Sequence, residues 1–299
     1  MRPARVGVIG GSGFYEMEGL SDVEEVRLTT PFGDPSDAVV IGTLHGVRAA
    51  FLPRHGKGHR LLPAEVPSRA NVYALKSLGV EFVIGVSAVG SLRQEIAPLD
   101  MVVPDQLIDR TQGRPGSFFG RGLVAHVAFA EPFCPVLGRV LFESASEASA
   151  SGGGAAVHRG GTYVVMEGPA FSTRAESLLY RSWAADLIGM TALPEAKLAR
   201  EAEMCYATLA CVTDYDCWHE MEESVSAAMI IANLLRNVAT ARRVVSLAVQ
   251  RLPQERACPC AEALRSALVT PLDLVPENVR RELAPIIGRY LAAPARGGG

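Results

Sequence analysis

The chain has 299 residues, of which 48% are hydrophobic and 20% are charged, and its formal net charge at pH 7 is -3. This composition is typical of a folded globular protein, excludes a disordered one, and gives no electrostatic basis for binding nucleic acid. No apolar run reaches the roughly 18 residues that a membrane-spanning helix needs, and no signal-peptide core follows the first residues, so we expect a cytoplasmic protein without a membrane role.

The first expected strand, residues 5–9, runs into the glycine-rich turn Gly10-Gly11-Ser12-Gly13. Glycines let backbone amides approach an anion and Ser12 adds a hydroxyl donor, so this turn could hold a phosphate. Its spacing matches neither the dinucleotide-binding fingerprint nor the P-loop. A tight turn that needs positive φ explains the glycines equally well.

A predicted hairpin over residues 38–52 leads into Arg54 and His55. A guanidinium fixed at a strand end can bind anion oxygens in a bidentate way, although a solvated basic loop is the alternative. We do not expect His55 and His59 to bind a metal, because the glycines between them disfavour the helix that this ligand spacing needs.

After a helix over residues 67–78, a buried strand at 80–86 is expected to end in a small polar loop, 87–92, which begins with Ser87 and Ala88. It is the third such loop after a strand. Loops that follow strands can converge at one edge of an open α/β sheet, where ligands bind.

The middle of the chain contains three further candidate site residues, His126, Glu167 and Phe171. His126 lies in an apolar segment, where a packed, hydrogen-bonded histidine is expected. Glu167 follows a predicted strand at 162–166, and Thr173 with Glu176 forms a capping box for a helix that begins just after Phe171 and Ser172. Phe171 could stack on an aromatic ligand or fill the core.

Thr191 follows a short strand at 186–190 and stands near a helix N-terminus, where its hydroxyl could meet an anion or cap the helix. The buried strand that starts at Ala207 then delivers Asp214 and Asp216. If the extended conformation persists, both carboxylates point to one side and suit proton chemistry. A solvated turn rich in Asp is the alternative.

Helices are expected over 221–250 and 276–291, the second with a kink or break at Pro285, before a tail that frays. The chain shows no internal repeat and no linker long enough to force a domain boundary, so we predict one domain over residues 1–299, of which 255–299 form a C-terminal helical segment and tail. Six cysteines are scattered rather than grouped as metal-ligand pairs, so no metal site is expected. Most should be small buried hydrophobic residues, while Cys258-Pro-Cys260 could be redox-active or simply two exposed thiols.

Hydroxyls, amides and a guanidinium after several strands suit a bound phosphate, and the acids at Glu167, Asp214 and Asp216 suit a leaving group that takes a proton. Phosphorolysis of an N-glycoside combines the two requirements.

Several ordered motifs carry a resemblance to a known family over residues 5–250. They are Val8-Ile-Gly-Gly-Ser-Gly13, Thr30-Pro-Phe-Gly-Asp-Pro-Ser-Asp37, Arg54-His-Gly56, Ser87-Ala-Val-Gly-Ser-Leu92, Ala130-Glu-Pro-Phe-Cys-Pro135, Met166-Glu-Gly-Pro-Ala-Phe-Ser-Thr-Arg-Ala-Glu-Ser177, Gly189-Met-Thr-Ala-Leu-Pro-Glu195 and Thr213-Asp-Tyr-Asp-Cys-Trp218. With these motifs the chain resembles the 5'-methylthioadenosine phosphorylases within the trimeric purine nucleoside phosphorylases. The resemblance implies one α/β domain with a central mixed, twisted sheet flanked by helices.

The resemblance also implies a role for each candidate residue. The catalytic pair would be Asp214 and Asp216, which would read the base, and an acid at the first position favours adenine. Met190 would lie against the ribose, Phe171 and Ser172 beside the purine, and His126 would come from a neighbouring subunit to the 5' substituent. The expected phosphate ligands are Ser12, Arg54, His55, Ser87, Ala88 and Thr191.

The expected reaction cleaves S-methyl-5'-thioadenosine with inorganic phosphate as co-substrate, in purine and methionine salvage, without a cofactor or metal. A homotrimer, possibly a hexamer, is implied. The alternatives within the enzyme class are a purine nucleoside phosphorylase, a methylthioinosine phosphorylase and a water-dependent nucleosidase. A non-catalytic nucleoside-binding or redox-responsive regulator is the alternative outside it. Disulfides at Cys258/Cys260 and Cys134/Cys205 are suggested by thermophilic relatives alone.

Overall fold

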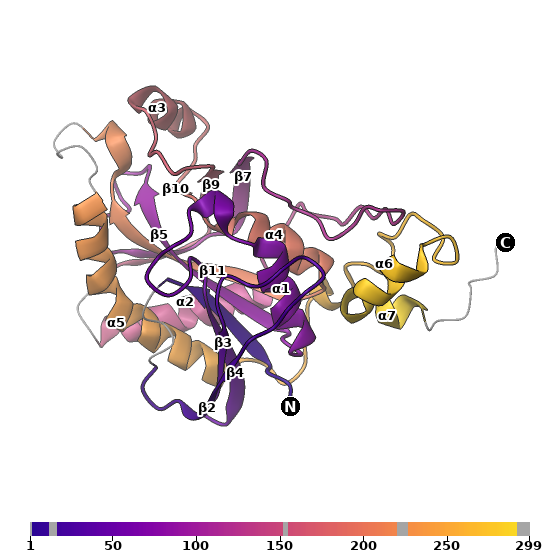
Figure 1. Cartoon of the computed structure of the whole chain (residues 1–299). Helices are drawn as coiled ribbons and strands as arrows, with labels where there is room; N and C mark the ends of the chain where they lie inside the picture. Colours follow the sequence, from indigo (N-terminus) through magenta and orange to yellow (C-terminus); the bar gives the residue numbers. More distant parts are fainter. Residues whose placement is uncertain (1, 12–16, 152–154, 220–226, 292–299) are drawn as a thin grey trace.

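The computed structural model describes residues 2–11, 17–151, 155–219 and 227–291. Their centre is an 11-stranded mixed sheet with the strand path β2-β3-β4-β1-β5-β10-β9-β7, while β11 pairs with β5 and β6, and β6 pairs with β8 (Figure 1). The strands are β1 Val6–Gly10, β2 Ser21–Val26, β3 Val39–Leu44, β4 Val47–Pro53, β5 Phe82–Ser91, β6 Met101–Val103, β7 Gln106–Arg110, β8 Val157–Arg159, β9 Thr162–Met166, β10 Leu187–Gly189 and β11 Cys205–Asp214.

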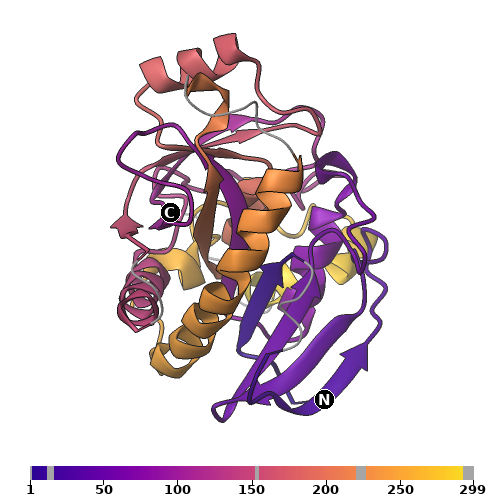
Figure 2. The ribbon, with the colours of Figure 1, turned by 90° about the vertical axis from the view of Figure 1, so that its left-hand side faces the viewer.

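Helices cover both faces of the sheet, α2 and α5 on one face and α1 and α4 on the other (Figures 1 and 2). The α-helices are α1 Ser68–Ser77, α2 Pro135–Ala150, α3 Arg174–Ser182, α4 Ala192–Glu201, α5 Ala227–Arg251, α6 Glu277–Glu282 and α7 Ala284–Leu291, and the short 3-10 helices are η1 Pro63–Glu65, η2 Asp216–Trp218 and η3 Pro259–Glu262. This arrangement confirms the predicted α/β fold with helices on a mixed sheet.

Strand β11 runs through the middle of the molecule and connects the two cores. All ten of its residues are buried. Because side chains alternate along a strand, Ala207 and Leu209 pack into the core beneath α2 and α5, while Tyr206 and Val212 pack into the core beneath α1 and α4. Both faces of β11 are therefore covered along its whole length, up to Asp214.

Local signals in the sequence correspond well to the observed boundaries. The capping box of Thr173 and Glu176 starts α3, and the Thr173 hydroxyl accepts a hydrogen bond from the Glu176 backbone. The predicted break in the last helix lies at Leu283, between α6 and α7, two residues before Pro285. The expected fraying of 297–299 concerns residues outside the described part.

The expected loop after residue 86 is wrong, because β5 continues to Ser91. It does so because β11 pairs with it in parallel from Phe82 opposite Cys205 to Gly90 opposite Asp214. Gly90 is required at this point, since a Cβ there would lie 2.9 Å from the Asp214 carboxylate. The small residues from Ser87 onward therefore belong to the strand that pairs with the end of β11.

The segment that follows β7 lies beside the C-terminal helices (Figure 1). Val124 and Val269 form a backbone hydrogen bond of 2.9 Å, and the Arg121 guanidinium donates to Glu282 at 2.6 Å. Among the described helices, none is long and apolar enough to cross a membrane.

Candidate active site

Four parallel strands bring their carboxyl ends to one edge of the sheet. β1 pairs with β4 and with β5, and β5 pairs with β11, in each case in parallel. Arg54 follows β4, Asp214 ends β11, and Ser87 lies in the last half of β5. This is the edge at which an open α/β sheet binds its ligands, so the convergence predicted from the sequence is confirmed.

Arg54 is buried and firmly held. Its Nε donates to Glu195 Oε1 at 2.5 Å and its Nη2 to Glu195 Oε2 at 3.2 Å, a bidentate pair. The carbonyl groups of Val86 and Ile9 accept from Nη1 and Nη2 at 2.9 and 3.1 Å. Burial lowers the pKa of Arg54, but the charge of Glu195 more than offsets this and raises the pKa overall. The guanidinium is therefore a fixed positive charge.

His55 is the next residue and is neutral near pH 7. Burial and the neighbouring Arg54 charge lower the pKa of His55 to about 4. Its Nδ1 lies 2.9 Å from the Leu61 carbonyl, so this nitrogen carries the proton and Nε2 is left as an acceptor. The His55 and His59 rings stack at a centroid distance of 4.4 Å.

Ser87 and Thr191 meet from opposite sides of the site. The Thr191 hydroxyl donates to Ser87 Oγ at 2.7 Å and lies 3.4 Å from the Tyr163 hydroxyl. Although Thr191 precedes α4, its side chain makes no capping hydrogen bond. The interpretation of Thr191 as a helix cap is therefore wrong, and its hydroxyl faces the site.

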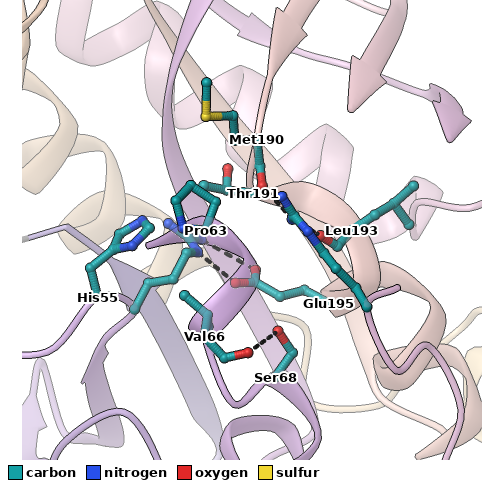
Figure 3. Close-up of a pocket in the computed structure, with 10 residues that line it drawn as sticks. His55, Pro63, Val66, Ser68, Met190, Thr191, Leu193 and Glu195 are labelled. Atoms are coloured by element: carbon teal, nitrogen blue, oxygen red, sulfur yellow. Dashed lines mark hydrogen bonds and ion pairs between the residues drawn. The ribbon is translucent and has the colours of Figure 1, made fainter. Parts of the chain in front are cut away.

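Most of these groups line one cavity, shown in Figure 3, while Ser87 contacts it through the Thr191 hydroxyl. Arg54, His55, Met190 and Thr191 line it, as the sequence predicted. The lining also contains residues that the sequence did not single out, namely Pro63, Val66, Ser68, Arg114, Leu193 and Glu195. The two charged ones were missed because their partners lie far away in the chain. An acid among apolar neighbours in α4 was the only available signal for Glu195.

Met190 is held from two sides. Its carbonyl accepts from Arg114 Nη1 at 2.7 Å. Its sulfur packs against Gly168, and a Cβ at that position would clash with Met190 Sδ. The absence of a side chain at Gly168 therefore leaves the space that the Met190 side chain occupies beside the cavity.

Glu167 does not serve as a free acid. Its Oε2 accepts from Arg114 Nε at 3.1 Å and from the Gln112 backbone at 2.6 Å. The Arg114 side chain is 4% exposed, so the pair is largely shielded from water. Glu167 is therefore paired with Arg114, whereas the two aspartates lie at the end of β11.

Asp214 ends β11 and is 4% exposed. The Thr213 hydroxyl lies 2.7 Å from Oδ2, and Oδ1 accepts from the Asp216 backbone N–H at 2.9 Å. The chain turns here, with φ +54° at Asp216, so the extended conformation does not persist as expected. Such a turn is typical of Asp, whose side chain bonds the backbone two residues on.

Asp216 is also buried, and its environment differs from that of Asp214. Burial raises the pKa of Asp216, the nearby Asp214 charge adds to this rise, and the hydroxyls of Ser177 and Ser172 oppose it. Among the described residues, Asp216 Oδ2 has no hydrogen-bond partner. A buried carboxyl oxygen of this kind is suited to a ligand that supplies the missing partner.

Phe171 is 46% exposed, so it does not fill the core. Ser172 lies near the acids, since its carbonyl is 3.3 Å from the Cys217 thiol, which accompanies Asp216 in η2. Ala88 lies in β5 opposite Cys211. Ser12 lies outside the described residues.

His126 is exposed and does not line the cavity. Its backbone N–H donates to the Ala267 carbonyl at 2.9 Å, which places it on the segment beside the C-terminal helices. The expectation of a packed side chain is wrong, because this segment presents one face to solvent.

Comparisons with known proteins show the family of this chain. Residues 5–250 match the model of the phosphorylase superfamily. An S-methyl-5'-thioadenosine phosphorylase of Geobacter sulfurreducens is 58% identical over 96% of this chain and 99% of its own. The corresponding protein of Chloroflexus aurantiacus is also 58% identical, over 97% and 99%.

Solved structures show the same relationship. A methylthioadenosine phosphorylase from an antarctic soil metagenomic library superposes with a TM-score of 0.91 at 50% identity, over 96% of this chain and 99% of that one. A methylthioadenosine phosphorylase from Schistosoma mansoni in complex with adenine gives 0.81 at 38% identity, over 88% and 96%. The chain belongs to the S-methyl-5'-thioadenosine phosphorylase family of the phosphorylase superfamily.

Proposed function

We propose that this protein catalyses the phosphorolysis of S-methyl-5'-thioadenosine to adenine and 5-methylthioribose 1-phosphate, a step of purine and methionine salvage. The observation that carries the proposal is that a fixed guanidinium, Arg54, and a buried acid pair, Asp214 and Asp216, lie at the same edge of the sheet. The named relatives at 58% identity support the choice of nucleoside.

Phosphate would bind at the cavity beside Arg54. Four hydrogen bonds hold its guanidinium to Glu195 and two carbonyls, so its charge is positioned before the anion arrives. The hydroxyls of Ser87 and Thr191 can turn toward phosphate oxygens, with Ser12 and Ala88 completing the set as family resemblance suggests. Neutral His55 presents Nε2, which can accept the O–H of hydrogenphosphate.

Adenine would lie against the acid pair, with Met190 beside the ribose and Phe171 and Ser172 near the base. In the reaction a phosphate oxygen forms a bond to C1' as the bond from C1' to N9 breaks. The electron pair of that bond moves into the adenine, which accepts a proton at N7. Positioning of the two reactants and the fixed charges would supply most of the rate.

The proton could come from either aspartic acid, and the sequence favoured Asp214. Two donors contact the Asp214 oxygens, and such contacts favour a carboxylate. Asp216 has the raised pKa and the buried oxygen without a partner among the described residues. On these grounds Asp216 is the better proton donor and Asp214 the better acceptor for the 6-amino group.

The active unit would be a homotrimer, which could pair into a hexamer. His126 is exposed on a segment that does not line its own cavity, as expected of a residue that completes a neighbouring site. The same region exposes Val124, Val269 and Leu274, whose exposed fractions are 45%, 61% and 70%. Equilibrium sedimentation tests this assembly, and a fully active monomer would contradict it.

One assay tests the activity itself. Adenine release from S-methyl-5'-thioadenosine is measured beside hypoxanthine release from inosine and from methylthioinosine, each with and without phosphate. We expect adenine release that depends strictly on phosphate. Faster hypoxanthine release would favour the purine nucleoside or methylthioinosine phosphorylases, release without phosphate a nucleosidase, and no release a binding protein.

A further inference from the structure

Four cysteines that are far apart in the sequence come together at the opposite end of β11 from the acid pair. The thiol sulfurs of Cys134, Cys205, Cys258 and Cys260 all lie within 4.8 Å of one another. Three of these side chains are buried and Cys258 is half-buried, so the expectation of two exposed thiols at 258 and 260 is wrong. The spacing of the cysteines in the chain gave no sign of this group.

Each sulfur comes from a rigid part of the fold. Cys134 is the N-cap of α2, Cys205 is the first residue of β11, and Cys258 and Cys260 belong to the start of η3. The Cys134 backbone N–H donates to the Tyr206 carbonyl at 2.8 Å, which ties the first two together. The four thiols therefore converge because the packing of three elements places them there.

The spacing of the sulfurs is that of a tetrahedral thiolate site. Zinc binds cysteine sulfur at about 2.3 Å, so the sulfurs of a regular tetrahedral site are about 3.8 Å apart. Cys205 Sγ and Cys258 Sγ are 3.3 Å apart, and no pair of the four sulfurs exceeds 4.8 Å. Small shifts of the side chains would bring all four to the required distance.

One of the four sulfurs already accepts a hydrogen bond from the backbone. Cys134 Sγ accepts the backbone N–H of Leu137 at 3.5 Å. Because the metal ligand is the deprotonated sulfur, a backbone donor at this position helps to stabilise the thiolate that a cation needs.

We propose that Cys134, Cys205, Cys258 and Cys260 bind one Zn²⁺ ion in a closed structural site, with release of their thiol protons. Four soft sulfur ligands in a tetrahedral arrangement select zinc among the common divalent ions. All four positions are taken by protein, so the ion has no open position for a substrate and would serve stability alone.

The ion would fasten the C-terminal segment to the sheet. Cys258 and Cys260 precede Leu264 and the helices α6 and α7, while Cys134 and Cys205 belong to the central layers. The nine residue steps from Cys205 to Asp214 along β11 span about 30 Å, so the ion would lie far from the reacting groups. Its loss should weaken folding and leave phosphate and nucleoside contacts intact.

Two disulfides are the alternative for the same sulfurs. They differ from a zinc site in requiring an oxidant and in the number of free thiols that remain. Disulfides require an oxidant that removes two electrons for each bond, whereas zinc binding removes only protons. A protein with two disulfides would show two free thiols after unfolding without reductant, from Cys211 and Cys217. A zinc protein would show all six after unfolding with a chelator.

The test uses the full-length protein, purified with reductant and without a metal-affinity step. We expect about one zinc per chain by elemental analysis, a lower Tm after chelation, and restoration of Tm by added Zn²⁺. Replacement of zinc by Co²⁺ should give the absorption spectrum of a tetrahedral cobalt thiolate, which reports the ligands directly. Absence of zinc after incubation with Zn²⁺ and reductant, or two free thiols, would overturn the proposal.

Matched variants separate ligation from packing. Cys134→Ser should lose zinc, while Cys211→Ser, a change at a buried thiol outside the cluster, should keep about one zinc per chain. Should Cys134→Ser fail to fold, substitutions at the half-buried Cys258 provide a second pair of variants. Cys258→His should retain the ion because imidazole is a zinc ligand, and Cys258→Ala should lose it. Equal zinc content in Cys258→Ala and the unchanged protein would overturn the assignment.

Discussion

Arg54 and Glu195 form a bidentate ion pair whose side chains are only 4% and 2% exposed, although 141 residues separate them in the chain. The Tyr206 hydroxyl donates to Glu195 Oε2 at 2.9 Å and completes the contacts of the carboxylate. The pair joins the end of β4 to α4 and fixes the orientation of the guanidinium at the cavity.

Glu195→Ala should lower the free energy of unfolding by about 3 to 5 kcal/mol, because it leaves a buried arginine without its counter-charge. It should also raise the KM for phosphate, since the guanidinium loses its fixed orientation. Urea unfolding and steady-state kinetics measure the two effects. The control is Glu262→Ala, which breaks an ion pair whose side chains are 62% and 60% exposed and should change stability by less than about 0.5 kcal/mol. Equal effects in the two variants would refute a special role of the buried pair.

The acid pair gives a second prediction. Asp216→Asn should lower kcat by roughly two to four orders of magnitude, the range for a lost general acid. It should also remove the fall in activity that the unchanged enzyme shows when rising pH deprotonates Asp216. Asp214→Ala should lower kcat/KM for the nucleoside, because the 6-amino group loses its hydrogen-bond acceptor. Near-normal kinetics in Asp214→Ala would exclude it from the chemistry.

A substrate with a better leaving group tests the role of the proton itself. A nucleoside of a 7-methylated purine carries its positive charge already and needs no proton at N7. It should restore turnover in whichever variant has lost the acid, and not in a variant that has merely lost its fold. An equal loss of turnover with both substrates would show that the carboxyl group maintains the structure and does not transfer the proton.

Residues whose role follows from their own strand and turn could be predicted from the sequence. Arg54, Thr191 and Asp214 each end or closely follow a strand, and parallel pairing brings strand ends together. Contacts between distant segments could not be predicted. Nothing near Glu195 in the chain indicates that its partner is Arg54, and the spacing of the cysteines indicates no common site, because both depend on the packed sheet.

The pKa of His55 predicts a pH dependence of stability. In the folded protein the pKa of His55 is about 4, against 6.5 for an unperturbed histidine. Between these values the unfolded chain binds a proton that the folded chain does not, so stability is lost as pH falls from 6.5 toward 4. The slope from this group reaches at most about 1.4 kcal/mol for each pH unit.

His55→Gln should therefore flatten the stability profile between pH 4 and 6.5 and leave the profile above pH 7 unchanged in slope. Urea unfolding at several pH values, in buffer without phosphate, measures the difference between the two proteins. An identical slope below pH 6.5 would mean that His55 takes up its proton in the folded state.

Gly168 and Met190 supply the last prediction. Gly168→Ala puts a Cβ where Met190 Sδ now lies, so the methionine must move away from the ribose position. We expect kcat/KM for the nucleoside to fall on the order of tenfold to a hundredfold, as for a small displacement of a positioning group, with little change in the KM for phosphate. Alanine is also strained at φ +68°, and Gly46→Ala is the control, since Gly46 has φ +77° and a Cβ added there would meet no atom within 4 Å. Loss of stability alone in both variants would show that the glycine serves the backbone, whereas loss of nucleoside binding in Gly168→Ala only would show that it makes room for Met190.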